Sequence, residues 1–130
     1  MWLPGDDDEA KTVTALVVED LYDHREILRE TLEELGVRVL EARDGREAIR
    51  VFKQHRAAVD LLVTDIVMPK MDGFELAERL RALAPPLRVL FVSGLSNPEP
   101  NSGMAYLEKP FRREDFIAAI QKLLPDLREP

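Results

Sequence analysis

Short apolar segments alternate with helical segments along the whole chain, and this alternation restricts the possible folds more than any other feature. The five apolar segments lie at residues 12–18, 38–42, 60–65, 88–93 and 105–109. The third and fourth are nearly continuous apolar runs, which is typical of parallel strands covered on both faces. Strands that alternate with helices need crossover connections, which are right-handed in parallel sheets. The sequence therefore predicts an α/β fold, a parallel sheet with helices on both faces.

Three of the expected helices begin with the same local signal, an aspartate followed three residues later by a glutamate. The three pairs are Asp23 with Glu26, Asp44 with Glu47, and Asp72 with Glu75. Such a pair can satisfy backbone N–H groups that have no partner in the first helical turn. These helices are predicted to end near Leu35, Gln54 and Leu83, and a fourth is predicted at 114–124.

The connection between the fourth and fifth apolar segments differs from the others because it holds no helical pattern. It contains Pro98, Pro100 and Gly103, and proline interrupts a helix because it lacks an amide hydrogen and clashes with the preceding turn. A parallel crossover usually takes at least about 10 to 12 residues, so this connection is only just long enough. We predict an irregular crossing, with the helix missing or reduced to a loop.

Composition and charge exclude several functions. The chain has 130 residues and no cysteine, which removes disulfides, thiolate zinc sites and cysteine nucleophiles. A net charge of -7 argues against binding to DNA, which needs a cationic face. Residues 1–11, with acids at positions 6–9, are interpreted as a flexible acidic linker, 12–125 as one domain and 126–130 as a tail. Because the sequence shows no membrane span or signal peptide, we expect a cytoplasmic protein whose segment here makes no membrane contact.

Polar residues follow the ends of the predicted strands, where parallel α/β sheets bind their ligands. They are Glu19 and Asp20 after the first strand, Asp65 after the third, Ser93 after the fourth and Lys109 after the fifth. Three carboxylates that lie together repel one another unless a divalent cation such as Mg2+ bridges them. A lysine and a hydroxyl can stabilise phosphoryl oxygens, and one carboxylate, best placed at Asp65, can accept the phosphoryl group.

Each of these residues also has a purely structural interpretation. Glu19 and Asp20 can cap the helix that follows them. Taken alone, Ser93 is more often a turn residue, and Lys109 is more often a solvated lysine at an edge strand. Their joint placement at one edge of the sheet favours the functional interpretation. His24 and His55 are interpreted as surface residues.

Four segments resemble the signature blocks of response-regulator receiver domains, in the same order. They read LVVEDLYDHREIL, LLVTDIVMPKMDGFEL, VLFVSG and YLEKPF, and the block at residues 65–73 is the most specific. The resemblance covers about residues 12–125 and implies a flavodoxin-like, doubly wound sheet with strand order 2-1-3-4-5. It implies a phosphoacceptor signalling domain rather than an enzyme, one that takes a phosphoryl group from a kinase phosphohistidine and switches conformation.

The resemblance also implies a role for individual residues. Asp65 matches the phosphoacceptor, and Mg2+ is expected on Asp20, on Asp65, on the backbone carbonyl of Val67 and, through water, on Glu19. Glu19 replaces the more usual aspartate but keeps its charge on a longer arm, so Mg2+ binding is expected to persist.

Further matches concern the switch and the shape of the site. Ser93 matches the switch hydroxyl, Lys109 the lysine that pairs with the phosphorylated aspartate, and Tyr106 the aromatic residue that moves inward. Pro110 matches a cis-proline, an isomer that is tolerated before proline. The positions that shape the loop after the third strand are Met68, Pro69, Asp72 and Gly73.

The expected partner is a histidine kinase or a histidine phosphotransfer domain. The face that usually relays phosphorylation lacks its helix here, so we expect a monomer that does not dimerise through that face. The opening WLPGDDDE resembles the exit from the ATP-binding domain of hybrid histidine kinases with a C-terminal receiver, and a free-standing regulator is the alternative.

Two other classes of function were weighed. A pseudo-receiver, a protein-interaction module without phosphate chemistry, is disfavoured by the intact acids, serine and lysine. A phosphatase with an aspartate nucleophile needs a second aspartate two residues later, where Val67 stands.

Overall fold

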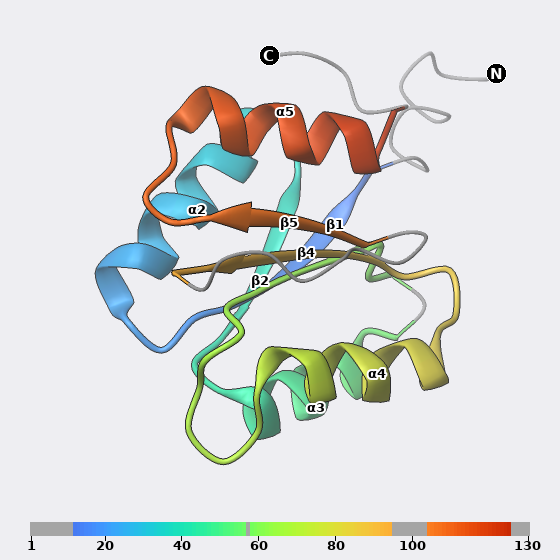
Figure 1. Cartoon of the computed structure of the whole chain (residues 1–130). Coiled ribbons are helices and arrows are strands. Elements are labelled where there is room, and N and C mark those ends of the chain that lie inside the picture. Colours follow the sequence, from blue (N-terminus) through green and yellow to red (C-terminus); the bar gives the residue numbers. More distant parts are fainter. Residues whose placement is uncertain (1–11, 57, 95–103, 126–130) are drawn as a thin grey trace, which may run out of the picture.

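The computed structural model describes residues 12–56, 58–94 and 104–125 (Figure 1). Within these ranges the elements are β1 (Thr14–Val18), α2 (Tyr22–Glu34), β2 (Arg38–Ala42), α3 (Gly45–Gln54), β3 (Leu61–Thr64), α4 (Gly73–Leu83), β4 (Arg88–Ser93), β5 (Met104–Glu108) and α5 (Arg113–Leu123). The predicted linker at 1–11 and tail at 126–130 lie outside the described residues. The predicted alternation of strands and helices is confirmed.

The five strands form one parallel sheet in the order β2-β1-β3-β4-β5, which confirms the predicted strand order. The register aligns the carboxyl ends of the two central strands, because Val18 of β1 pairs with Thr64 of β3. Just beyond this pair, the N–H of Asp65 donates to the carbonyl of Val18 over 3.2 Å. The residues that follow β1 and β3 are therefore neighbours.

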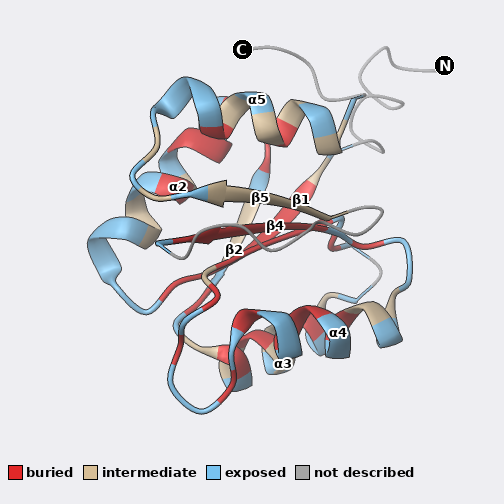
Figure 2. Ribbon diagram, in the orientation of Figure 1, coloured by how far each residue is buried: buried red, intermediate tan, exposed pale blue. Residues whose placement is uncertain are grey.

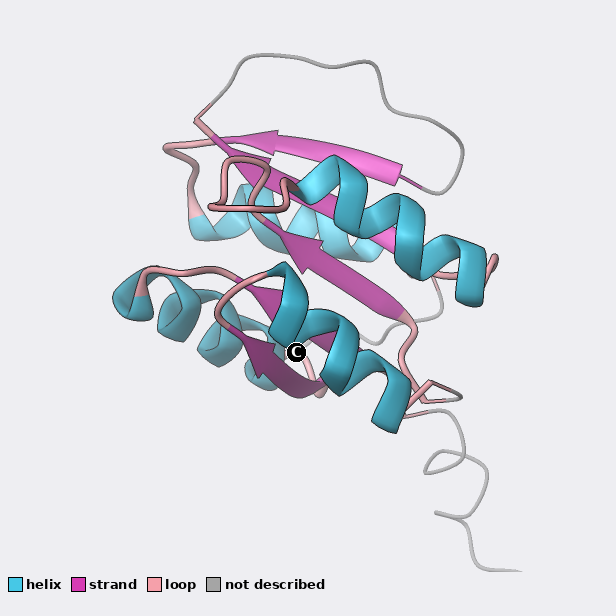
Figure 3. Cartoon of the chain, turned by 90° about the horizontal axis from the view of Figure 1, so that it is seen from below, coloured by secondary structure: helices cyan, strands magenta, loops and turns pink. Residues whose placement is uncertain are grey.

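Helices cover both faces of the sheet, as Figures 1 and 3 show, with α3 and α4 on one face and α2 and α5 on the other. Each face has its own apolar core. In β1, Leu16 and Val18 belong to the core under α3 and α4, whereas Ala15 and Val17 belong to the core under α2 and α5. Since side chains alternate along a strand, the continuous apolar run of β1 supplies both cores. Figure 2 shows this buried centre.

Two of the three predicted caps are present, and the third is wrong. The side chains of Asp44 and Asp72 accept hydrogen bonds from the N–H groups three residues later, both over 2.8 Å. Asp23 does not cap α2, because the loop after β1 has only three residues and the helix already begins at Tyr22. Asp23 instead lies in the first turn, where a negative charge still interacts favourably with the helix dipole.

The connection between β4 and β5 is short. The described residues contain no helix between Ser93, the last residue of β4, and Met104, the first of β5. The predicted irregular crossing falls on residues 95–103, which lie outside the described part of the chain.

Across the described ranges, none of the helices has the length and apolar character needed to cross a membrane.

Candidate functional site

Three carboxylates meet at the carboxyl edge of the sheet. Glu19 and Asp20 come from the loop after β1, Asp65 follows β3, and one oxygen from each lies within 4.8 Å of the other two. This confirms that the sheet brings together the three predicted acids. Carboxylate oxygens are the ligands that Mg2+ prefers, and a divalent cation removes the repulsion among them. The donor set therefore fits Mg2+ at this position.

Lys109, just after β5, extends to two of these three acids. Its Nζ lies 2.9 Å from Oε1 of Glu19 and 3.4 Å from Oδ2 of Asp65. Burial lowers the pKa of Lys109, but the hydrogen bond and charge of Glu19, together with Asp65, outweigh burial and hold this pKa above its ordinary value. Lys109 is therefore a cation fixed between two of the acids.

Glu19 is fully buried, and both of its carboxylate oxygens have protein donors. Oε1 accepts from Lys109, and Oε2 accepts from the N–H of Leu21 over 3.1 Å. His24 is half-exposed, as predicted for a surface residue, but its Nδ1 lies 3.9 Å from Oε1 of Glu19. The sequence did not indicate this proximity, because no motif links His24 at the start of α2 to Glu19 in the loop before it.

The two oxygens of Asp65 have different surroundings. Oδ1 accepts from the N–H of Ile66 over 2.6 Å and from the N–H of Val67 over 3.3 Å. Oδ2 faces the ammonium group of Lys109. The amides thus fix the orientation of the side chain, while the second oxygen lies beside a cation. The predicted use of the Val67 carbonyl as a metal ligand stays a prediction.

The loop after β3 packs closely on the start of α4. The N–H of Gly73 donates to the carbonyl of Ile66 over 2.8 Å. A Cβ atom at position 73 would collide with the carbonyl oxygen of Asp65 and would lie 2.9 Å from Cα of Ile66. Only glycine fits this approach, which supports its predicted shaping role. Pro69 lies in the same loop, where its carbonyl accepts from the N–H of Met71 over 2.7 Å.

Ser93, Tyr106 and Pro110 lie on the side of the site formed by β4 and β5. Ser93 is buried, and its carbonyl accepts from the N–H of Lys109 over 2.8 Å. Tyr106 is half-buried and packs against the core under α3 and α4. The peptide bond between Lys109 and Pro110 is cis, the isomer that the resemblance implies. The roles of Ser93 and Tyr106 in switching stay predictions.

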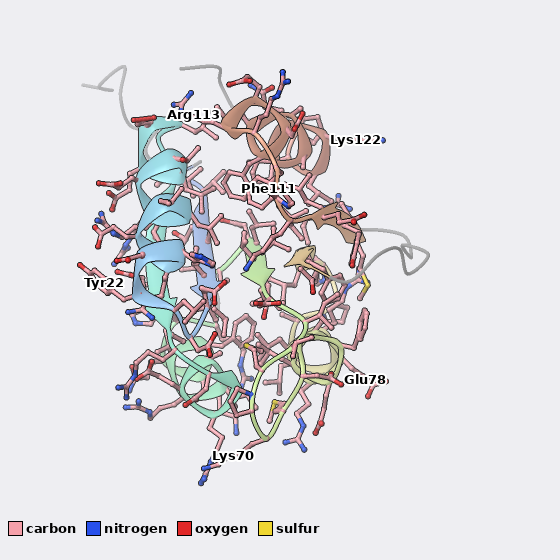
Figure 4. All side chains as sticks on the ribbon, turned by 60° about the vertical axis from the view of Figure 1, so that its left-hand side comes forward. Tyr22, Lys70, Glu78, Phe111, Arg113 and Lys122 are labelled. Atoms are coloured by element: carbon pink, nitrogen blue, oxygen red, sulfur yellow. The ribbon has the colours of Figure 1, made fainter. Side chains whose placement is uncertain are left out.

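A cleft of about 690 Å3 opens beside Asp20, between the start of α3 and the loop after β3. Its walls carry charges of both signs, from Arg43, Asp44, Arg46 and Lys70 among others. Figure 4 shows Lys70 extending from this loop, with Tyr22 at the start of α2. The residues that line the cleft come from three separate segments, so no single stretch of the sequence indicates it.

Known proteins resemble this chain in sequence and in fold. The sequence profile described as "Response regulator receiver domain" matches residues 15–121. Over 115 residues the chain is 36% identical to the response regulator receiver protein CpdR of Brucella abortus, an alignment that covers 84% of this chain and 94% of CpdR. It is 32% identical over 123 residues to the sensor kinase CckA of Brucella abortus, covering 90% of this chain but 13% of that kinase.

A solved structure with the same fold is the response regulator TrrA of Thermotoga maritima, crystallised in complex with Mg2+-BeF. It matches with a TM-score of 0.76 at 28% identity, covering 86% of this chain and 99% of that chain. The chain thus spans nearly all of one curated relative, CpdR, and only a small part of another, CckA.

Proposed function

This chain belongs to the receiver domain family of two-component response regulators, and we propose that it accepts a phosphoryl group on Asp65 from a phosphohistidine. Receiver domains are signalling modules that interact with histidine kinases or phosphotransfer proteins. The observation that carries the proposal is the position of Asp65, with Oδ1 held by two amides and Oδ2 3.4 Å from the ammonium of Lys109. A nucleophilic oxygen thus lies beside a fixed positive charge.

The transfer follows from this arrangement. An oxygen of Asp65 forms a bond to phosphorus while the P–N bond to the partner's imidazole breaks, and the imidazole nitrogen keeps the electron pair. Lys109 lies where it can stabilise the negative charge on the phosphoryl oxygens. Slow attack by water on the phosphorus of the acyl phosphate releases inorganic phosphate and returns Asp65 to its carboxylate.

Asp20 and Asp65 would hold Mg2+ directly and Glu19 would hold it through water, with the backbone carbonyl of Val67 as a further ligand. When bound, Mg2+ supplies neutralisation of the carboxylates and of the incoming phosphoryl oxygens. Glu19 is already oriented by the N–H of Leu21, so its carboxylate needs little rearrangement to take part.

The conformational response is assigned to β4 and β5. Ser93 lies at the end of β4, and its carbonyl accepts from the backbone N–H of Lys109. We assign Ser93 the role of the hydroxyl that moves toward the phosphoryl group, and Tyr106 the role of the aromatic residue that follows it. Phosphorylation then shifts a pre-existing equilibrium between two arrangements of these strands.

Three exposed apolar residues lie close in sequence to the proposed metal ligands. Leu21 is 53% exposed and Tyr22 63%, just after Asp20, and Val67 is 62% exposed, two residues after Asp65. These side chains are available for contact with a partner protein. We propose that this partner is a histidine kinase or a phosphotransfer domain. We also propose that the protein is a monomer, that it lies in the cytoplasm and that it does not contact DNA. Its proposed role is that of a phosphoacceptor rather than of an enzyme.

The test uses acetyl phosphate as a small phosphodonor with Mg2+, followed by intact mass measurement. We expect a single phosphoryl adduct on the wild-type chain, lost when EDTA removes Mg2+ and absent from Asp65→Asn. The matched control is Asp60→Asn, which changes another aspartate beside β3 and should keep the adduct. A wild-type chain that forms no adduct and binds no Mg2+ would instead be a pseudo-receiver.

A further inference from the structure

Arg25 makes contacts that the proposed phosphoryl chemistry does not use. It lies in the first turn of α2, yet only 12% of its side chain is exposed. Its Nη1 donates to the backbone carbonyl of Glu19 over 2.8 Å, and its Nε donates to Oε1 of Glu41 over 3.1 Å. The guanidinium also lies over the ring of Tyr22, 5.5 Å from its centroid.

The carbonyl that Arg25 holds belongs to the peptide that joins Glu19 to Asp20. The N–H of Glu19 donates to the carbonyl of Ala42 in the neighbouring strand over 3.2 Å. β1 itself ends at Val18, so the regular pairing of the sheet stops before this peptide. The contact from Arg25 therefore gives the peptide between the two acids a partner just beyond the last regular strand pairing.

Glu41 makes this contact rigid. It lies in β2, at a position that pairs with Val17 of β1, and it anchors the guanidinium to the edge strand. Arginine suits the position because its planar fork can donate in two directions at once, whereas a lysine ammonium is a point charge on a flexible stem. A cation that is largely buried needs such partners, because burial without them is costly.

We propose that Arg25 is a positioning residue for the metal site. By holding the carbonyl of Glu19, it sets the directions of the Glu19 and Asp20 carboxylates and so the affinity of the site for Mg2+. Arg25 itself touches neither the metal nor the phosphoryl group. This inference rests on the proposed function, because it assumes that these acids bind Mg2+.

Whether the loss of Arg25 weakens or tightens Mg2+ binding distinguishes a positioning role from a purely electrostatic one. A positive charge near the acids repels Mg2+, so its removal should tighten Mg2+ binding if charge is its only contribution. If Arg25 orients the acids, its removal should weaken Mg2+ binding in spite of the lost repulsion. Changes in groups that orient metal ligands typically cost about 10- to 100-fold in metal affinity.

The experiment measures the Kd of Mg2+ alone by titration calorimetry, well below the unfolding temperature of each variant. We expect Arg25→Gln to weaken Mg2+ binding by about tenfold. Arg25→Lys keeps the charge but replaces the planar fork with a single ammonium on a flexible stem, so it should also weaken binding. The matched control is Arg29→Gln, one turn later in α2, which loses the same charge from ion pairs with Glu26, Glu33 and, at 3.8 Å, Glu41. It keeps the contact between Arg25 and the carbonyl of Glu19, so it should leave the affinity unchanged or slightly tighter.

The outcomes distinguish the inference from the proposed function. A wild-type chain that binds no Mg2+ refutes the proposed function at this site, whatever the variants do. If the wild type binds Mg2+, an affinity of Arg25→Gln equal to or tighter than the wild type overturns the inference, and so does equal weakening in Arg29→Gln. If Arg25→Gln fails to fold, Arg25→Lys and Glu41→Ala carry the test, and unchanged Mg2+ affinity in both overturns it.

Discussion

The inner strands β1 and β3 are more deeply buried than the edge strand β5. Every residue of β1 and β3 is buried, and these strands lead to Glu19 and Asp65. No residue of the edge strand β5 is classed as buried, yet this strand carries Tyr106 and leads to Lys109. The acids that would bind metal and phosphoryl group are thus fixed by the core. Of the two residues assigned to the response, Ser93 is buried at the end of β4. Tyr106 lies on the less buried β5, which suits a segment that must change position.

A leucine-to-alanine substitution in the central strand β3 gives the largest expected loss of stability, and the same substitution in the edge strand β5 is its comparison. Leu62 in β3 is fully buried, whereas Leu107 in β5 is only partly buried. Leu62→Ala should lower the free energy of unfolding by about 2 to 5 kcal/mol, and Leu107→Ala by about 1 kcal/mol because less apolar surface is lost. Urea unfolding measures both values. Equal losses at the two positions would contradict the difference between centre and edge.

A smaller effect is expected where the loop after β3 meets α4. Gly73→Ala introduces a methyl group that collides with backbone atoms of Asp65 and Ile66, which cannot move aside cheaply. We expect a loss of about 1 to 3 kcal/mol in the free energy of unfolding, together with slower formation of the phosphoryl adduct.

Gly45→Ala is the matched control for this change. A Cβ at position 45 would have side-chain atoms of Met71 as its nearest neighbours, Sδ at 2.8 Å and Cβ at 3.1 Å, so Met71 has to move slightly. Alanine also favours the helix over glycine, so Gly45→Ala should cost less stability than Gly73→Ala. Equal losses in urea unfolding would mean that the close approach at position 73 does not constrain the site.

The smallest expected effect concerns Lys109, which follows the edge strand β5 and lies beside Glu19 and Asp65. Lys109→Met removes a positive charge that lies against Glu19 and Asp65, so Mg2+ should bind roughly tenfold more tightly. The phosphoryl adduct should nevertheless form more slowly, because the charge that stabilises the phosphoryl oxygens is gone. Calorimetry with Mg2+ and timed mass measurement give the two results.

Lys122→Met, in the last turn of α5, is the charge-matched control and should change neither quantity. Weaker Mg2+ binding by Lys109→Met would show that Lys109 holds the acids in place rather than competing with the metal. Arg25 and Lys109 are therefore expected to act in opposite directions on the same affinity.

Local patterns in the sequence predicted the parts of the fold that depend on neighbouring residues. The apolar runs predicted all five strands, and the caps at Asp44 and Asp72 were correct because each depends on residues three positions apart. The cap at Asp23 was wrong because the three-residue loop after β1 starts α2 earlier. That loop length depends on the packing of the helix on the sheet, which no short pattern encodes.

The candidate site could be predicted as a set of residues but not as a set of contacts. Strand ends indicated Glu19, Asp65 and Lys109, and the sheet brings them together. The direct contact between Lys109 and Glu19 joins residues 90 positions apart, a distance along the chain that no local pattern covers. Arg25 was missed because its partners are a backbone carbonyl and a residue of another strand, neither of which forms a motif with it.

The most direct test of the central claim locates the phosphoryl group within the chain. After treatment with acetyl phosphate and Mg2+, borohydride reduces an aspartyl phosphate to homoserine, and peptide mass spectrometry identifies the changed residue. The account predicts homoserine at position 65 and at no other acid, with none when Mg2+ is removed. Homoserine at Asp20, or no homoserine in a chain that is folded and supplied with Mg2+, would contradict it.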